Sequence, residues 1–198
     1  MTSIFLKAKH WQLFLLTFGI SMIFQFVLMG TMIANIGSGN NPNPSVLFSY
    51  IKLFPIMMVI FTGVFFGWFW SVVTRLQSKI PEEARMKLGR FKILLFIPLV
   101  YLFAISILIG GVMNGLISEP SGTIPSEIFK FIATIIRMYL FFMFCIFHSI
   151  YFVAKTFKTA KLQKQVSFSD FSGEFFMIWF YPIGIWIIQP KINKIIEE

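Results

Sequence analysis

The sequence predicts an all-α membrane protein: a four-transmembrane-helix bundle with a kinked C-terminal interfacial or re-entrant segment and with both termini in the cytoplasm. Two observations predict this fold class, namely four long apolar stretches and a one-sided distribution of basic residues between them. Of the 198 residues, 57% are hydrophobic and 13% are charged. Soluble domains are nearer half apolar and a quarter charged, so the composition itself indicates a membrane protein.

The four apolar stretches cover residues 11–36, 47–74, 91–117 and 129–154. Each is longer than the roughly 20 residues that cross the hydrocarbon core of a bilayer. The first follows Lys7 and Lys9, as the apolar part of a signal peptide would, but it is too long for one and lacks a small-residue cleavage site. We therefore expect a retained first span, a bundle with its cytoplasmic extension over residues 1–166, and a separate tail over residues 167–198.

Basic residues concentrate on one side of the predicted membrane. Of the 17 Lys and Arg residues, 14 precede the first span, lie between the second and third or at the very start of the third, or follow the fourth. The loop at residues 35–46 has no charge, and the loop at 118–126 carries only Glu119. The positive-inside rule then places both termini in the cytoplasm. The net charge of +9 indicates contact with anionic membrane lipids rather than with nucleic acid.

The tail is not expected to cross the membrane. Its strictly apolar part, residues 175–188, has 14 residues, which fits an interfacial or re-entrant element better than a span. A crossing would also place Lys191 and Lys194 outside, against the charge rule. We expect a helix to start near residues 169–172, Pro182 to break it, and Pro190 to end the segment that follows.

Several tail residues are candidates for an interface. Trp and Tyr side chains settle at headgroup depth, and kinked segments could anchor the C-terminus, plug the cytoplasmic mouth of the bundle or form a docking surface. The candidates are Trp179, Tyr181, Pro182, Gly184, Trp186, Gln189 and Pro190.

Two segments carry a resemblance. Residues 76–98 and 154–195, which include the pattern F-Y-P-I-G-I-W-I-I-Q-P-K-I-N at 180–193, resemble an uncharacterised family of small bacterial four-span inner-membrane proteins. The resemblance implies a multi-pass protein of the bacterial cytoplasmic membrane, and it implies no activity.

Arg137 is the sharpest polar signal within the predicted spans. An Arg at the centre of a membrane helix costs about 2.5–3.5 kcal/mol on insertion scales and usually faces the bundle interior or water. At about 100° per residue it shares one face of the fourth span with other polar residues. These are Glu127, Lys130, Thr134, His148 and Lys155, with Phe141 interrupting the seam.

Three interpretations of Arg137 remain open. It could be a structural residue bonded to neighbouring helices, with Ser21, Gln25, Tyr101 and Asn114 as candidate partners. It could contact an anionic substrate in a cavity, or pair with a partner subunit. His148 and the lone Cys145 are expected to be bundle residues without catalytic or metal-binding roles.

Small residues recur at four-residue spacing in two spans, at Gly63 and Gly67 and at Gly111 and Gly115. This spacing lets membrane helices approach closely. We expect packing within the chain, with a subunit interface as the alternative.

No motif of a hydrolase, metalloprotease or nucleotide-binding enzyme occurs in the chain. The sequence therefore favours a protein that is not an enzyme and has no cofactor: an accessory or scaffold subunit of a larger inner-membrane complex, docking through its basic cytoplasmic face and Gly-lined helices. The alternative is a small carrier or channel, expected to be a homo-oligomer, that binds an anionic solute with Arg137. A weaker interpretation treats the tail as a lipid-surface sensor.

Overall fold

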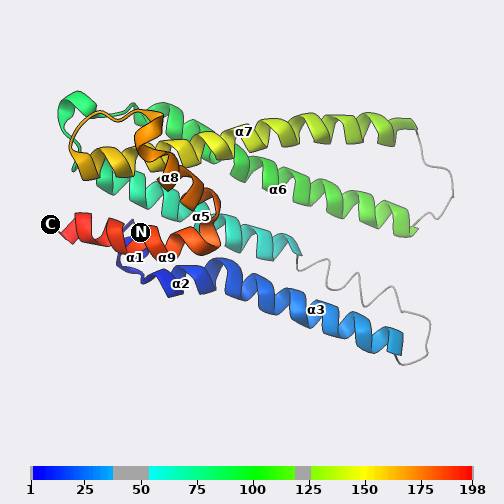
Figure 1. The fold of residues 1–198 in the computed structure, drawn as a ribbon. Helices are drawn as coiled ribbons and strands as arrows, with labels where there is room; N and C mark the ends of the chain where they lie inside the picture. Colours follow the sequence, from blue (N-terminus) through cyan, green and yellow to red (C-terminus); the bar gives the residue numbers. More distant parts are fainter. Residues whose placement is uncertain (1, 38–53, 119–125, 198) are drawn as a thin grey trace. The chain divides into compact units, whose positions relative to one another are not determined.

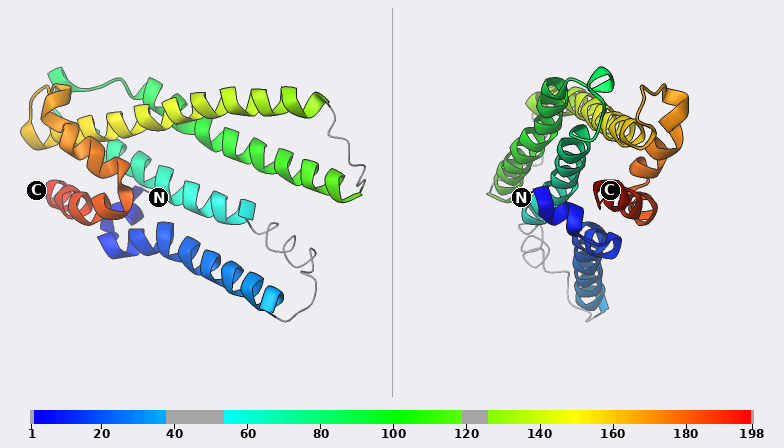
Figure 2. Two further views of the ribbon diagram at one scale, coloured as in Figure 1. Left: turned by 45° about the vertical axis from the view of Figure 1, so that its right-hand side comes forward. Right: turned by 90° about the vertical axis from the view of Figure 1, so that its left-hand side faces the viewer.

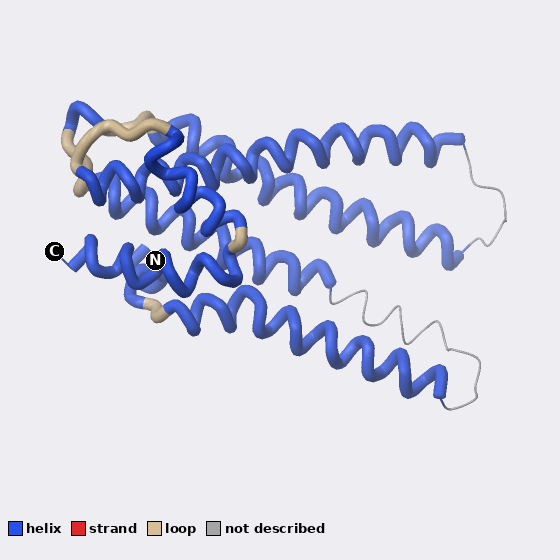
Figure 3. Tube along the Cα trace, viewed as in Figure 1, coloured by secondary structure: helices blue, strands red, loops and turns tan. Residues whose placement is uncertain are grey.

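A computed structural model describes residues 2–37, 54–118 and 126–197, and all regular secondary structure in these ranges is helical (Figure 3). Four helical segments are long and apolar enough to cross a membrane: His10–Ala34, Met57–Gln77, Leu88–Ile105 and Ala133–Leu162. They confirm the four spans predicted from the sequence. Most of the two predicted outer loops, and the beginning of the second predicted span, lie outside the described residues.

The first span is continuous from His10 but is assembled from three helical segments. Its second segment is a π-helical turn, a form that widens the helix locally. In chain order (Figure 1) the elements are α1 (Thr2–Lys7), α2 (His10–Phe14), η1 (Leu15–Gly19), α3 (Ile20–Gly37), α5 (Phe54–Gln77), η2 (Glu82–Ala84), α6 (Leu88–Ser118), α7 (Ser126–Leu162), α8 (Phe168–Trp179) and α9 (Tyr181–Glu197).

The chain divides into two compact units. Unit 1 comprises residues 1–86 and 150–198, and unit 2 comprises residues 87–149. The long helix α7 contributes its last part to unit 1 and the rest to unit 2. The tail at 167–198 therefore belongs to the same unit as the N-terminal helices, a grouping that joins segments far apart in the sequence.

Within unit 1, the tail packs against the beginning of the chain (Figure 2). α9 contacts α1, α2 and α5, and α8 contacts α9. One face of α9 supplies the buried side chains of this packing, because apolar residues recur there every three or four positions. They are Tyr181, Ile185, Ile188 and Ile192.

The start of α8 corrects one sequence prediction. The helix begins at Phe168, before the expected range of 169–172, because Ser167 caps it. The carboxylate of Asp170 accepts hydrogen bonds from the backbone N–H and the side-chain hydroxyl of Ser167, both at 2.8 Å. Asp three residues after Ser is a capping-box spacing, so the sequence itself contains the signal for this helix start.

The expected role of Pro190 was wrong. Pro190 lies inside α9, which continues to Glu197, although proline removes a helical hydrogen bond. Gln189, immediately before the proline, and Ile192, two residues after it, are fully buried, so their contacts hold the helix through the proline. α8 and α9 are separated at Phe180, and Pro182 falls in the first turn of α9, where proline is well tolerated.

Candidate functional site

Gln189 is the centre of a buried polar network that joins the tail to the rest of unit 1. Its side chain is 0% exposed. Its Oε1 accepts a hydrogen bond of 2.7 Å from the indole Nε1 of Trp68 on α5. Its Nε2 lies 3.1 Å from the carbonyl oxygen of Phe5 and 3.2 Å from that of Ala8, and 2.9 Å from Asn193 Oδ1. One amide therefore ties α9 to α5 and to the N-terminal helices.

Aromatic contacts surround this network. Trp186 of α9 lies against His10 and Phe14, with ring centroids 4.6 and 5.8 Å apart. Tyr181 packs edge-on against Phe65 and Trp68 of α5, at 5.0 and 5.5 Å. Aromatic pairs at such separations add to simple area burial. The first span, the second span and the tail thus share one aromatic cluster.

Gly184 is required by the turn between α8 and α9. A Cβ at this position would overlap the carbonyl oxygen of Met177 in α8. The Gly184 N–H donates to the carbonyl of Phe180 at 2.8 Å. Any side chain here would push the two helices apart, which gives the glycine of the tail pattern a specific packing role.

The hydroxyl of Tyr181 is the exception in this well-paired region. The residue is 3% exposed, and within the described residues its oxygen has no hydrogen-bond partner. The Thr17 hydroxyl, which donates its own hydrogen bond to the carbonyl of Leu13 at 2.8 Å, is close enough to lower the pKa of Tyr181. Burial is the larger influence and raises the pKa of Tyr181, so this residue is held neutral.

The tail is also joined to α7 by an ion pair. Lys158 Nζ and Glu174 Oε1 lie 2.7 Å apart, with side chains 20% and 16% exposed. At the end of the second span, Gln77 Nε2 donates to the carbonyl of Met86, which follows η2, at 2.8 Å. The ion pair holds α8 on the end of α7, and the Gln77 hydrogen bond folds residues 78–85 back onto the end of α5.

Outside this interior, the tail exposes apolar side chains. Trp179 and Trp186 are 46% and 47% exposed, and Phe180 and Ile183 are 62% and 70% exposed. The two tryptophans can therefore reach lipid or a partner, whereas Tyr181, predicted as a headgroup-depth residue, lies in the interior of unit 1.

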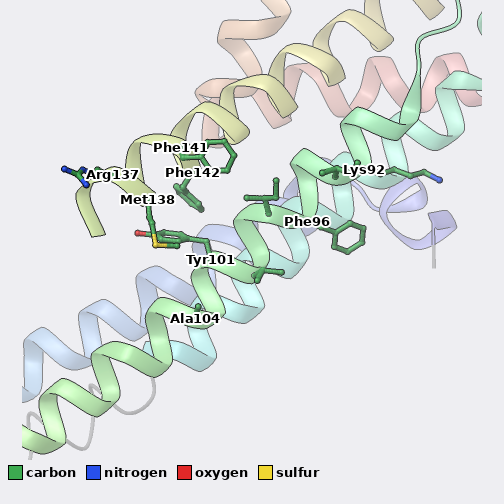
Figure 4. Close-up of a pocket in the computed structure, with 11 residues that line it drawn as sticks. Lys92, Phe96, Tyr101, Ala104, Arg137, Met138, Phe141 and Phe142 are labelled. Carbon is green, nitrogen blue, oxygen red and sulfur yellow. The ribbon is translucent and has the colours of Figure 1, made fainter. Parts of the chain in front are cut away.

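Unit 2 presents a different kind of surface. A pocket of about 730 Å³ is formed by α6 and α7, with Phe96 and Tyr101 on one helix and Met138 and Phe142 on the other. Arg137 borders it, and Figure 4 shows its guanidinium directed away from α6. Of the predicted partners of Arg137, Tyr101 lines the same pocket; the lining is otherwise almost entirely apolar, apart from Lys92.

The remaining predicted residues are dispersed. Thr134 is exposed on α7, and His148 is half-buried with its ring 6.3 Å from that of Phe144. Gln25 is exposed on α3. Asn114, Gly111 and Gly115 lie in α6, where the structure describes only the backbone.

The two glycines of α5 differ from each other. A Cβ on Gly67 would lie 2.9 Å from the ring of Phe5, whereas one on Gly63 would meet nothing within 4 Å. Gly67 therefore allows α1 to lie close to α5, and Gly63 has no such role in the described contacts.

Two features escaped the sequence analysis. Trp68, which donates to Gln189, carried no local signal, because its partner is 121 residues away. The Ser167–Asp170 cap was detectable from its spacing.

In the described part of the chain, no group of three or more His, Cys, Asp or Glu residues could hold a metal ion.

Comparison with known proteins adds no identification. No family model, curated protein or solved structure matches the chain. The resemblance of the tail pattern to a bacterial membrane-protein family accordingly stays a prediction.

Proposed function

We propose that the chain is a non-catalytic accessory or scaffold subunit of a larger complex in the bacterial inner membrane. In this proposal both termini are cytoplasmic, and the tail forms part of a basic docking face at the inner membrane surface. The positive-inside distribution of Lys and Arg supports this orientation.

The observation that carries the proposal is the interlocking of the tail with the start of the chain through Gln189. A terminal anchor needs only apolar contact with lipid. Here a fully buried amide accepts a hydrogen bond from Trp68, and its Nε2 lies within hydrogen-bonding distance of Phe5, Ala8 and Asn193, so α8 and α9 form a fixed surface. Exposed aromatic side chains on such a surface are typical of sites that contact a partner.

Co-purification from the native host tests the proposal. A tagged full-length chain, extracted in a mild detergent, should bring down a discrete set of membrane proteins at stoichiometric amounts. Gly184→Ala should lose them because it displaces α9, while Gly173→Ala, whose added Cβ meets nothing within 4 Å, should retain them. Recovery of the wild-type chain alone or as a homo-oligomer would refute the scaffold role.

The alternative, an oligomeric carrier or channel for an anionic solute, has less support. The pocket bordered by Arg137 is lined mainly by apolar side chains, and the guanidinium is directed away from α6. Anion flux into liposomes that is abolished by Arg137→Ala would restore this alternative, and unchanged flux would end it.

A further inference from the structure

Four lysines surround one pocket at an end of unit 1. The pocket has a volume of about 630 Å³ and is lined by Lys79, Lys161, Lys191 and Lys194 together with Gln163. These residues come from the segment after α5, the last turn of α7 and the second half of α9, and the ends of these three helices lie together in Figure 1.

The positive charge of the pocket is not neutralised by the described residues. The described ion pairs are Arg85 with Glu82 and Lys158 with Glu174, and neither includes a lysine of the pocket. Glu197 follows Lys194 by three residues but forms no ion pair with it in the described structure. Converging ammonium groups repel one another, so an anion bound among them would be stabilised by all four.

Gln163 holds the lysine-bearing segments in place. Its Nε2 donates to the carbonyl of Lys79 at 3.0 Å and to that of Ala160 at 2.6 Å. Its backbone φ is 53°, a left-handed conformation at the end of a helix that normally favours glycine. Glycine could make the turn but not these bonds, which fix Lys79 beside the end of α7.

Helix α9 supplies the other wall of the pocket, and its packing fixes the direction of its lysines. Ile188 and Ile192 are buried at 1% and 0% exposure, whereas Lys191 and Lys194 are exposed one turn apart. Residues three apart lie on one face of a helix, so the packing that buries the isoleucines directs both lysines to the pocket.

We propose that this pocket binds a phosphate group. A lysine ammonium group is a compact point charge that binds phosphate. Several of them around one pocket therefore suit a phosphate group. The adjacent candidate spans end at Gln77 and Leu162, within two residues of Lys79 and Lys161, which places the pocket at the level of lipid headgroups. The phosphate can come from an acidic phospholipid or from a soluble phosphate. The inference does not depend on the scaffold function, because it requires no protein partner.

The test uses the full-length protein in a neutral detergent. Native mass spectrometry with added phosphatidylglycerol or phosphatidylcholine measures which lipid stays bound to the protein. The thermal shift of the protein in millimolar inorganic phosphate tests binding of a soluble phosphate. The variant Lys191→Gln/Lys194→Gln should weaken phosphatidylglycerol binding about tenfold to thirtyfold, from about 1 kcal/mol for each lysine near an anionic surface. Lys191→Arg/Lys194→Arg, which keeps both positive charges, should bind phosphatidylglycerol nearly as well as the wild type.

Lys9→Gln/Lys87→Gln is the matched control, since it removes the same net charge from exposed lysines that do not line the pocket. Binding of phosphatidylglycerol but not inorganic phosphate, lost in the pocket variant alone, assigns a lipid headgroup. Binding of inorganic phosphate with the same dependence assigns a soluble phosphate. Equal losses in the pocket and control variants, or no preference for phosphatidylglycerol or phosphate over phosphatidylcholine, would overturn the proposal.

Discussion

Unit 1 and unit 2 are both built from long apolar helices, yet they are stabilised in different ways. Unit 1 joins distant parts of the chain through a buried amide, an aromatic cluster and a half-buried ion pair. Unit 2 consists of α6 and most of α7, and its pocket is lined mainly by apolar side chains, with Lys92 and Arg137 at its border. Within the described residues, the tail docks through specific polar contacts that substitution can remove, so substitutions there should have the larger effects.

The largest effect is expected from Gly184→Ala. The added methyl group would overlap the Met177 carbonyl oxygen, and backbone must move to accommodate it. Overpacking costs about 1–3 kcal/mol, occasionally more, and we expect the upper end or beyond. Thermal unfolding and limited proteolysis of the tail measure it.

Gly173→Ala is the matched control for this change, because the space around its Cβ is open. It should be neutral or stabilising by up to about 1 kcal/mol, the advantage of alanine over glycine in a helix. Equal stability of the two variants would show that the turn between α8 and α9 tolerates a side chain.

Gln189→Leu is expected to have the next largest effect. Leucine fills a similar volume but leaves the indole N–H of Trp68 without its acceptor. An unsatisfied buried group costs about 1–3 kcal/mol, and loss of the bonds to Phe5 and Ala8 should bring the total to about 2–4 kcal/mol. Denaturant unfolding in detergent measures it.

A double-mutant cycle with Trp68→Phe separates the hydrogen bond from general disruption, since contacting residues couple by about 0.5–3 kcal/mol.

Arg137→Leu provides the comparison in unit 2. That guanidinium is exposed, so a change of no more than about 1 kcal/mol is expected. A larger loss from Arg137→Leu than from Gln189→Leu would reverse the contrast between the units.

Glu174→Gln should have an intermediate effect. It removes the charge that pairs with Lys158 at 2.7 Å, where both side chains are less than about a quarter exposed. A hydrogen bond to a charged group is worth about 1.5–3 kcal/mol, and partial exposure reduces the expected loss to about 1–2 kcal/mol. Glu82→Gln, in the exposed pair with Arg85, should change stability by less than about 0.5 kcal/mol. Similar losses in the two variants would mean that the pair with Lys158 does not position α8.

The smallest effect concerns the pH dependence of the α8 cap. Hydrogen bonds from the backbone and then the hydroxyl of Ser167 lower the pKa of Asp170. When folding lowers the pKa of a carboxyl, the group contributes stability above its unfolded pKa of about 4. That stability is lost as the pH falls through the folded pKa. Thermal unfolding between neutral pH and pH about 3 should therefore show a slightly shallower dependence for Asp170→Asn. An identical profile would show that the cap contributes nothing.

The sequence by itself determined the four membrane spans, because hydropathy over about 20 residues is a local property that lipid reads directly. It also predicted Gly184 and Gln189 as interface residues, without the packing roles that the structure gives them. The Ser167 cap was equally local and could have been predicted from its spacing.

The tertiary structure alone decided what those residues do. Gln189 acquires its role from Trp68 and from the N-terminal helices, which lie more than a hundred residues away in the chain. Pro190 remains helical because Gln189 and Ile192 of the same helix are buried, and four lysines form one pocket because three helix ends meet. Such pairings depend on which segments the fold brings together, and local propensity and periodicity contain no record of them.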